Sequence, residues 1–366
     1  MRPGPPRVLC VTNMFPGPAD PDYGVFVADI CAALERRGVP VEVAAIDRRA
    51  RGGLRTPAKY TGLLARTATA ARRADVIWAH YLFPTGAIAA ACGRAARRPW
   101  VLTAHGRDVR NLSRPALRRA SAPALAGAAA VIAVSRHLRG ELRASGLALP
   151  PVAVVNMGVD LTRFAPADRA AARRRLGLAP SGPLVLAVGG LTERKNPLTL
   201  LQAFARVRAR APAARLALVG DGPLARAVDA GAAALGLGSS LIRPGALPHA
   251  QVVDWMAACD LLALVSRVEP LGQVALEALA SGRPVVATRV GGTAEVVPDG
   301  RAGALVDPAD PGAIAAAILA LLAAPPDPGV CRAAAEQHDV DRQAGRIEAV
   351  LEEVVARTGG PRRRSS

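Results

Sequence analysis

Residues 183–210 read PLVLAVGGLTERKNPLTLLQAFARVRAR. A short β-branched run, Leu184–Val188, is followed by two glycines and then by a longer helical stretch, Pro197–Arg210. A strand that passes through a glycine turn into a helix is the building unit of parallel sheets. Short apolar runs alternate with alanine-rich helical stretches on both sides of this segment. The sequence therefore predicts an α/β fold made of repeated βαβ units.

The predicted elements fall into two series. The expected strands are Arg7–Val11, Val41–Ile46, Asp75–Ala79, Trp100–Ala104, Ala130–Val134 and Val152–Val155 in the first series, and Leu184–Val188, Arg215–Val219, Leu261–Val265, Pro284–Ala287 and Ala304–Val306 in the second. The expected helices include Val25–Arg37, Thr85–Arg97, Arg136–Ala144, Pro197–Arg210, Leu224–Leu235, Gln251–Ala258, Gln273–Ala280 and Pro311–Ala323. Ligands of open α/β sheets bind beyond the carboxyl ends of the strands, so site residues are expected in the turns from strand to helix.

The length of 366 residues suggests two domains. The two series predict an N-terminal domain at 1–163 and a C-terminal domain at 181–340, with a cleft between them. Residues 164–180 are polar, rich in arginine and interrupted by prolines, so we expect them to connect the domains. An amphipathic helix is expected at 341–358, packing back across the cleft, and a mobile basic tail at 359–366.

Composition excludes several classes of protein. Hydrophobic residues make up 51% of the chain and charged residues 21%, which is ample for packed cores and excludes a disordered protein. No apolar run reaches the roughly 18–20 residues that span a bilayer, and no secretory signal is recognisable. The five cysteines contain no C-x-x-C pair and the histidines have no metal-ligand spacing, so neither a disulfide framework nor a metal is expected. We expect a cytoplasmic protein.

The formal charge of +18 is unevenly distributed. Residues 1–163 carry 24 basic and 10 acidic side chains, whereas residues 181–330 carry 12 of each sign. Two explanations stay open: a compositional bias toward arginine, and attraction of an anionic partner such as a phosphorylated substrate or a membrane surface. A nucleic-acid partner is disfavoured, because only 3% of the residues are aromatic and no nucleic-acid-binding motif is present.

Two loops of the first series carry candidate site residues. Gly24 comes directly before a predicted helix, where a glycine lets backbone N–H groups approach a phosphate. His105 follows the strand Trp100–Ala104 and is expected at its carboxyl tip, with Gly106 permitting a tight turn. Taken alone, Gly24 can serve turn geometry only and His105 can bond its own loop, so both interpretations stay open.

Arg194 and Lys195 lie just before the helix that starts at Pro197. Proline is favourable at the start of a helix, and the free N–H groups there attract anions. Together with two cations they form a candidate cradle for a diphosphate. Lys195 is one of only two lysines in a chain that otherwise uses arginine.

The most informative segment, residues 266–284, reads SRVEPLGQVALEALASGRP. Glu269 is expected in the loop before a helix and Glu277 about a turn inside that helix, with Leu271, Gly272, Gln273 and Val274 at the helix start. Free N–H groups at a helix start bind anions, and carboxylates accept hydrogen bonds from sugar hydroxyls. The alternative is an ordinary amphipathic helix with solvated glutamates, which the apolar neighbours of Glu277 make less plausible.

From about Arg7 to Ala323 the chain resembles the retaining glycosyltransferases of family 4, which have the GT-B architecture of two facing Rossmann-like domains. The matching elements are the family's H-G-x-D at His105–Asp108, its G-V-D turn at Gly158–Asp160, its E-x-K-x loop at Glu193–Asn196, its E-x7-E element at Glu269–Glu277 and the G-x-P-V-V-A-T-x-x-G-G-x-x-E-V-V segment at Gly282–Val297. The chain departs from the family at Gly190, where an arginine is frequent, and at Leu271, where phenylalanine is usual.

The resemblance implies a role for each matching residue. Lys195 would neutralise the diphosphate of a nucleotide-sugar donor, beside Arg194 as the candidate substitute for the missing arginine. The N–H groups at the helix start would assist, Glu277 would hold the ribose hydroxyls and Glu269 the hydroxyls of the transferred sugar. The remaining implied contacts are His105 to that sugar, Asp108 on the acceptor side, Gly24 to the phosphates and Leu247, in the turn Gly245–Leu247, near the base.

The resemblance implies an enzyme that moves a sugar from a UDP- or GDP-sugar to an acceptor hydroxyl, with retention and without metal or cofactor. His105, Glu269 and Lys195 form the implied catalytic set. The N-terminal domain would take the acceptor, which could be a cell-envelope glycan, a lipid-linked precursor or a small molecule, with peripheral contact to the inner face of the cell membrane. The alternatives are another GT-B enzyme, such as an epimerase or a phosphorylase, and a catalytically weak sugar-nucleotide-binding subunit.

Overall fold

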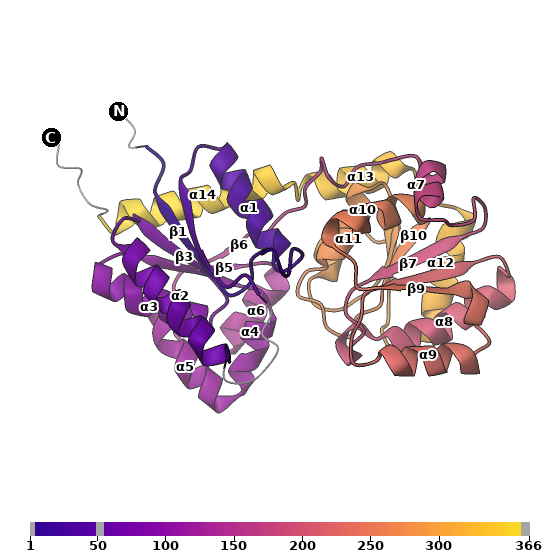
Figure 1. The fold of residues 1–366 in the computed structure, drawn as a ribbon, viewed down its shortest axis with the longest axis horizontal. Coiled ribbons are helices and arrows are strands. Elements are labelled where there is room, and N and C mark those ends of the chain that lie inside the picture. The colour runs from indigo at the N-terminus through magenta and orange to yellow at the C-terminus, as the bar shows by residue number, and fades with distance from the viewer. Residues whose placement is uncertain (1–3, 49–54, 360–366) are drawn as a thin grey trace. The chain divides into compact units, whose positions relative to one another are not determined.

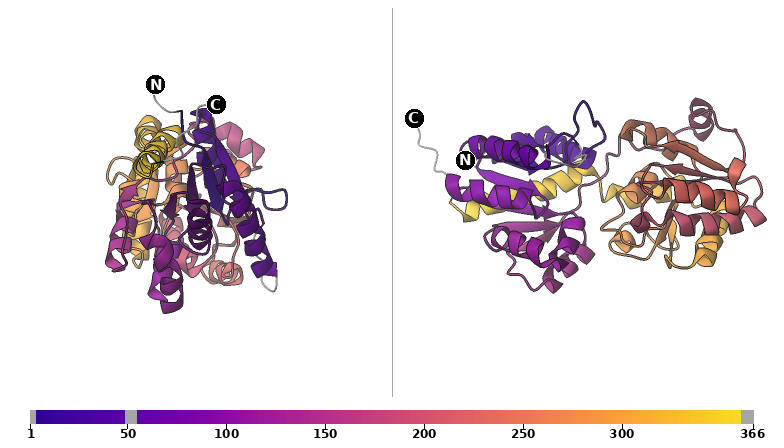
Figure 2. Two further views of the ribbon diagram at one scale, coloured as in Figure 1. Left: turned by 90° about the vertical axis from the view of Figure 1, so that its left-hand side faces the viewer. Right: turned by 60° about the horizontal axis from the view of Figure 1, so that its bottom comes forward.

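A computed structural model of the protein describes residues 4–48 and 55–359 (Figure 1). The chain divides into two compact units, which we call the first unit (Met1–Gly158 with Val340–Ser366) and the second unit (Val159–Asp339). Each unit is a parallel sheet with helices on both faces (Figures 1 and 2). The predicted α/β class with two Rossmann-like domains is therefore confirmed.

In its described part, the first unit has a six-stranded sheet in the order β2-β1-β3-β4-β5-β6. The strands are β1 (Val8–Thr12), β2 (Val41–Ala45), β3 (Val76–His80), β4 (Trp100–Ala104), β5 (Ala130–Ala133) and β6 (Val152–Val154). All residues of β1, β3, β4 and β5 are buried, as in other parallel sheets covered on both faces. This burial explains why their sequences are continuous apolar runs.

The helices of the first unit cover its sheet on both sides. They are α1 (Val25–Arg36), α2 (Arg55–Ala71), α3 (Thr85–Ala96), α4 (Arg107–Arg110), the 3-10 turn η1 (Asn111–Ser113), α5 (Pro115–Ala126), α6 (Arg136–Ala144) and α14 (Val340–Arg357). Helix α3 packs between α2 and α5 on one face, and α1 packs against α14 on the other (Figures 1 and 2). The sheet thus lies between two helical layers.

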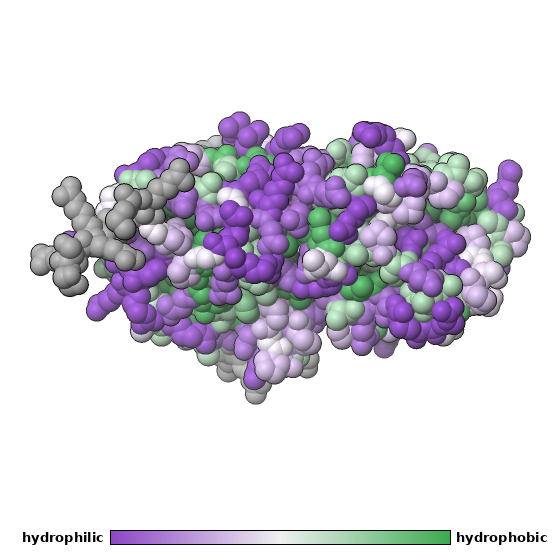
Figure 3. All heavy atoms as spheres, turned by 90° about the horizontal axis from the view of Figure 1, so that it is seen from above, coloured by the Kyte–Doolittle hydropathy of each residue, from purple (hydrophilic) through white to green (hydrophobic). Residues whose placement is uncertain are grey.

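Helix α14 belongs to the first unit, although it follows the second unit in the sequence. Its buried residues, among them Ala344, Ile347 and Leu351, recur at helical spacing and face α1 and the sheet. Arg36 and Arg37 form ion pairs with Asp341 and Glu348 at 2.7 and 2.6 Å. Hydrophilic side chains are the most numerous on this outer face (Figure 3). Exposed ion pairs such as those of Arg36 and Arg37 contribute about 0–1 kcal/mol each to stability, so the burial of apolar side chains holds α14 in place.

The second unit repeats the same plan, with the strand order β12-β11-β10-β7-β8-β9 in its described residues. The strands are β7 (Leu184–Val188), β8 (Arg215–Val219), β9 (Leu241–Gly245), β10 (Leu261–Leu264), β11 (Val285–Thr288) and β12 (Gly303–Val306). The helices are α7 (Arg169–Arg175), α8 (Pro197–Arg210), α9 (Ala225–Ala234), α10 (His249–Ala258), α11 (Gln273–Ala280), α12 (Pro311–Ala323) and α13 (Pro328–Glu336), with 3-10 turns η2 (Glu193–Lys195), η3 (Gly238–Ser240) and η4 (Thr293–Glu295). Helix α8 packs against α9 and α12, and α11 packs against α13.

The predicted strands are all present to within a few residues, and the structure adds β9, which was not predicted. This strand reads LIRPG and lies at the edge of the sheet. An edge strand tolerates proline because one side of its backbone needs no partner, and Pro244 obscured the strand pattern. Helices α2, α5 and α13 were not named either.

Residues 164–180 differ from the expected connection between domains. They lie within the second unit and contain α7, which packs against α10. Arg173 is 3% exposed and donates to Asp260 at 2.8 Å and to the Ala258 carbonyl at 3.0 Å. The arginines that suggested a solvated linker instead attach α7 to the second unit, and the division falls after Gly158 rather than after residue 163.

Within the described residues, no single helix is both long and apolar enough to cross a membrane. Helices α12 and α13, which meet at 117°, satisfy the length and composition criteria only as a bent pair. Residues 360–366 of the expected basic tail lie outside the described residues.

Candidate functional site

The strand order of the second unit brings two loops together. Strands β7 and β10 are neighbours, and the chain leaves them in opposite directions across the sheet. Such a switch point leaves a crevice beyond the carboxyl ends of the two strands. Lys195 lies in the loop after β7 and Glu269 in the loop after β10. Their side chains meet, with Lys195 Nζ 2.6 Å from Glu269 Oε2.

The Glu269 carboxylate is surrounded by hydrogen-bond donors. Ser266 Oγ donates to Oε2 at 3.1 Å, and the guanidinium of Arg194 lies 3.6 Å from the same oxygen. Glu269 is 7% exposed, whereas the side chain of Arg194 is 41% exposed. Two cations therefore face one buried carboxylate, and the outer cation is accessible to an incoming anion.

Close backbone approach holds these loops in place. A Cβ atom at Gly291 would lie 1.8 Å from the Glu269 carbonyl oxygen, and the N–H of Gly292 donates to that oxygen at 3.0 Å. The glycines after β11 thus fix the Glu269 loop. Beside Lys195, a cavity of about 30 Å³ at the end of β7 is lined by Gly189 and Gly190, among others.

Helix α11 begins at the expected place. Gly272 precedes its first residue, Gln273, and has a left-handed backbone with φ of 103°. Leu271 is buried, and Val274 lies in the first turn. The N–H groups of Ala275 and Leu276 donate to the Gly272 carbonyl at 2.9 and 3.3 Å, and the aligned peptide dipoles give the N-terminus of α11 a partial positive charge.

Glu277 lies one turn inside α11 and is 7% exposed, so it is not a solvated glutamate. Its Oε1 lies 3.1 Å from His249 Nε2. His249 begins α10, two residues after Leu247 in the loop that follows β9. The structure therefore brings the loop expected near a base close to the carboxylate expected near a ribose.

The first unit gathers a different group of side chains. His80 ends β3 and His105 follows the neighbouring strand β4. His80 Nδ1 lies 3.0 Å from His105 Nε2, and the two rings are stacked. Burial lowers the pKa of His105 to about 3, and burial together with the neighbouring His105 lowers the pKa of His80 well below its usual range. Both rings are therefore neutral at physiological pH.

Asp108 holds the His105 loop. Its carboxylate is 6% exposed and accepts N–H bonds from Leu82, His105 and Gly106 at 3.1, 3.1 and 2.8 Å. Burial raises the pKa of Asp108, against the opposing effect of these bonds. These bonds explain Asp108 as a residue that fixes the loop, and its expected contact on the acceptor side stays a prediction.

Gly24 is required by the packing of its own loop. It has φ of 77° before α1, and a Cβ atom there would lie 2.4 Å from the Met14 carbonyl oxygen. The loop geometry alone explains this glycine. Its contact with phosphates stays a prediction.

Within the second unit, the structure brings together the expected residues Arg194, Lys195 and Glu269. Side chains that were not predicted as site residues lie beside expected ones: His80 beside His105 in the first unit, and Ser266 beside Glu269 and His249 with Arg163 beside Glu277 in the second unit. His80 is visible in the sequence as a polar residue at the end of an apolar strand. Ser266 lies three residues before Glu269 in the same loop, whereas Arg163 and His249 are brought together from positions 86 residues apart and could be found only from the fold. No group of three or more side chains suited to binding a metal occurs in residues 4–48 and 55–359.

Two units of parallel sheet, each with polar side chains at the carboxyl ends of its strands, define a two-domain Rossmann-like protein. The family model described as "Glycosyl transferases group 1" matches residues 168–352, and the model described as "Glycosyltransferase Family 4" matches residues 23–163. The chain therefore belongs to glycosyltransferase family 4, with the GT-B fold.

Curated relatives agree with this assignment. The chain is 33% identical over 299 residues to a GDP-mannose-dependent alpha-(1-6)-phosphatidylinositol monomannoside mannosyltransferase of Mycolicibacterium smegmatis, covering 76% of this chain and 78% of that protein. It is 42% identical over 186 residues to D-inositol 3-phosphate glycosyltransferase 2 of Catenulispora acidiphila, covering 48% of this chain and 43% of that protein. The chain thus spans less than half of the length of the Catenulispora protein.

Solved structures share the fold along nearly the whole chain. Anabaena HepE in complex with UDP-glucose has a TM-score of 0.76 and 25% identity, covering 95% of this chain and 100% of HepE. WaaG, a glycosyltransferase involved in lipopolysaccharide biosynthesis, has a TM-score of 0.70 and 18% identity, covering 94% of this chain and 99% of WaaG.

Proposed function

We propose that the protein is an enzyme that transfers a sugar from a UDP- or GDP-sugar to an acceptor hydroxyl with retention of configuration. The observation that carries the proposal is the cluster of Lys195, Arg194 and Glu269 at the switch point of the second unit. This cluster joins accessible positive charge to a buried carboxylate. A sugar diphosphate presents the complementary groups, namely phosphate oxygens and sugar hydroxyls.

The departing nucleoside diphosphate sets the main electrostatic task. When the bond between the anomeric carbon and the diphosphate oxygen breaks, negative charge grows on the diphosphate. Lys195, Arg194 and the N–H groups at the start of α11 stabilise this charge, and the transfer then needs no metal ion. The acceptor oxygen forms the new bond to the anomeric carbon, and its proton passes to a leaving diphosphate oxygen. We assign no protein nucleophile.

The remaining donor contacts are those that the resemblance to the family implies. Glu269 accepts from hydroxyls of the transferred sugar and Glu277 from hydroxyls of the ribose. Leu247 lies near the base. In the first unit, His105 contacts the transferred sugar and Gly24 lies against the phosphates.

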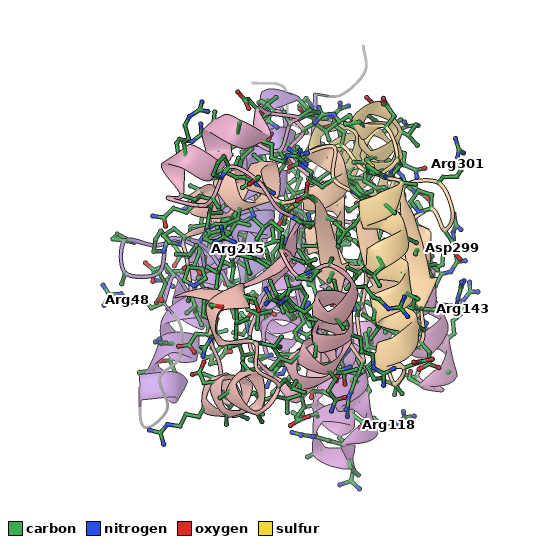
Figure 4. All side chains as sticks on the ribbon, turned by 90° about the vertical axis from the view of Figure 1, so that its right-hand side faces the viewer. Arg48, Arg118, Arg143, Arg215, Asp299 and Arg301 are labelled. Atoms are coloured by element: carbon green, nitrogen blue, oxygen red, sulfur yellow. The ribbon has the colours of Figure 1, made fainter. Side chains whose placement is uncertain are left out.

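The acceptor is proposed to be anionic. Two relatives are named for D-inositol 3-phosphate and phosphatidylinositol monomannoside, both of which carry phosphate. Arginines on α5 and α6 supply part of the positive charge of the first unit, and Arg143 is exposed and points away from the ribbon (Figure 4). A phosphorylated inositol or an anionic lipid surface matches this charge, and peripheral contact with an anionic membrane is proposed on the same ground.

The test is turnover of the full chain with GDP-mannose and UDP-glucose, in EDTA, with D-inositol 3-phosphate or phosphatidylinositol vesicles as acceptor. The proposal predicts release of GDP or UDP that depends on acceptor, and NMR of the product shows the anomeric configuration of the donor. Turnover without acceptor indicates an epimerase, and turnover with orthophosphate indicates a phosphorylase. Binding of the donor without turnover on any acceptor indicates a sugar-nucleotide-binding subunit.

A further inference from the structure

The turn at residues 159–164 follows β6 and begins the second unit. Its side chains contact His249 at the start of α10. Asp160 ends the G-V-D motif, to which the proposed function gives no role. Its Oδ1 accepts from the backbone N–H groups of Thr162 and Arg163 at 2.9 and 3.0 Å. The guanidinium of Arg163 lies 3.4 Å from Asp160 Oδ2. Desolvation raises the pKa of Asp160, but the bonds from Thr162 and Arg163 outweigh it and leave the pKa below its usual range, so this carboxylate is charged.

Arg163 also contacts His249, which begins α10. Its Nη1 lies 3.4 Å from His249 Nδ1, and the His249 ring packs on Phe164 with ring centroids 5.3 Å apart. A guanidinium only donates hydrogen bonds, so Nδ1 is the acceptor and the ring proton is assigned to Nε2. His249 Nε2–H then donates to Glu277 Oε1 at 3.1 Å.

The turn is also attached to the helix that carries Glu277. Arg332 donates to the Phe164 carbonyl at 2.6 Å and to the Ala280 carbonyl, in α11, at 2.8 Å. Phe164 is 1% exposed. The distance between the turn and α11 is therefore fixed by buried groups.

We propose that Arg163 and His249 are positioning residues that orient the carboxylate of Glu277 for the ribose of the donor nucleotide. His249 occupies Oε1 and directs the other oxygen, Oε2, to a ribose hydroxyl. Arg163 keeps the His249 proton on the nitrogen that faces Glu277. This inference rests on the proposed function, because it needs a ribose at Glu277.

The test measures a ribose preference, defined as the Kd of a 2′-deoxynucleoside diphosphate divided by the Kd of the ribonucleotide. Calorimetry on the full chain would use GDP with 2′-deoxy-GDP and UDP with 2′-deoxy-UDP. A hydrogen bond to a charged carboxylate predicts a preference of about tenfold or more for the unchanged protein. His249→Leu is expected to lower the preference to about twofold, since the carboxylate loses its fixed orientation.

Two further variants separate positioning from packing. His249→Gln retains an N–H donor near the position of Nε2 and is expected to recover most of the preference. Arg163→Met is expected to lower the preference when His249 is present and to have little effect beside His249→Gln, because an amide needs no tautomer control. His137→Leu is the matched control: it removes another His–Glu contact, His137 to Glu141 at 3.3 Å in the first unit, and should leave the preference unchanged.

Glu277→Ala distinguishes the two possible failures. If Glu277→Ala removes the preference but His249→Leu retains it in full, the relay is overturned and the donor site stands. If Glu277→Ala leaves the preference intact, the ribose does not bind at Glu277, and the relay falls together with that part of the proposed function. The melting temperature of each variant shows whether it is folded.

Discussion

The two units place chemically opposite clusters at the carboxyl ends of their parallel strands. In the second unit, a cation and a buried carboxylate meet between the loops after β7 and β10, with Lys195 2.6 Å from Glu269. In the first unit, two neutral imidazoles meet at the ends of β3 and β4, with His80 3.0 Å from His105. The charged cluster lies at the switch point of its sheet, between β7 and β10, and the uncharged cluster lies one strand beyond the switch point of the other sheet, between β3 and β4.

The difference indicates a division of work between the units. Cations suit a diphosphate, whose binding energy is electrostatic, while a neutral imidazole can hydrogen-bond a sugar hydroxyl without adding charge to the site. Variants of the second unit should therefore act mainly on donor affinity, and variants of the first unit mainly on turnover.

The largest effect is expected for Lys195→Ala. The substitution removes the diphosphate contact and the nearer of the two cations that balance the charge of Glu269, so this carboxylate repels the donor more strongly. We expect kcat/KM to fall by about 10²–10³-fold, the scale measured when one charge-stabilising donor is lost. Lys59→Ala, at the only other lysine of the chain, is the control and should stay near the unchanged protein. An equal loss in both variants would show that the charge of Lys195 has no specific role.

A smaller effect is expected for His105→Ala. A neutral imidazole contributes one ordinary hydrogen bond to the sugar, which corresponds to about tenfold in kcat. The Kd for UDP or GDP should not change, because the proposed contact of His105 is with the transferred sugar, which these nucleotides lack. Titration calorimetry and steady-state kinetics on the same variant check both statements. A weaker nucleotide Kd with normal kcat would reverse the proposed division.

Gly190→Arg should add a third cation to the cluster of Lys195, Arg194 and Glu269. Gly190 is exposed, and a Cβ atom there would find its nearest neighbour, the Asp221 carbonyl oxygen, at 3.5 Å, so a side chain fits. An added surface cation near a diphosphate is expected to tighten nucleotide binding about two- to fivefold. Gly190→Gln controls for side-chain bulk. Equal affinity of the arginine and glutamine variants, each measured by calorimetry, would mean that position 190 does not face the diphosphate.

The smallest expected effect concerns the imidazoles of His80 and His105, which should not titrate between pH 8 and pH 5. The pKa of His105 is lowered to about 3 and that of His80 lies well below its usual range, so neither ring gains a proton between pH 8 and pH 5. An ordinary histidine, with a pKa of about 6.5, titrates within this window. The unfolded chain therefore binds these protons more tightly, and the pair costs stability as the pH falls below about 6.5. NMR of the two imidazoles checks the prediction, and a midpoint near 6.5 for either ring contradicts it.

The sequence predicted the sheets well because buried parallel strands are continuous apolar runs. It also predicted Lys195 and Glu269 individually, since each lies in a short motif. Their contact joins residues 74 positions apart and depends on β7 and β10 being neighbours, which no local pattern encodes.

His80 and His249 were not predicted as site residues, for related reasons. The expected strand stopped at Ala79, and so His80 was left out of the site, although the structure ends β3 at His80. His249 follows β9, an edge strand that its proline concealed from pattern analysis. Sequence motifs therefore identified the residues proposed to touch ligand, and the strand order was needed to find those that hold them.

The most direct test of the central claim, that the second unit holds a nucleotide-sugar through Lys195, is ligand-induced thermal stabilisation. The full chain would be heated in EDTA with UDP-, GDP-, ADP- and dTDP-sugars, beside Lys195→Ala and Lys59→Ala. A ligand that binds only the folded state raises the melting temperature by mass action. We predict a rise with a UDP- or GDP-sugar that Lys59→Ala retains and Lys195→Ala loses. No rise with any of these sugars, or a rise that Lys195→Ala retains in full, would contradict the account.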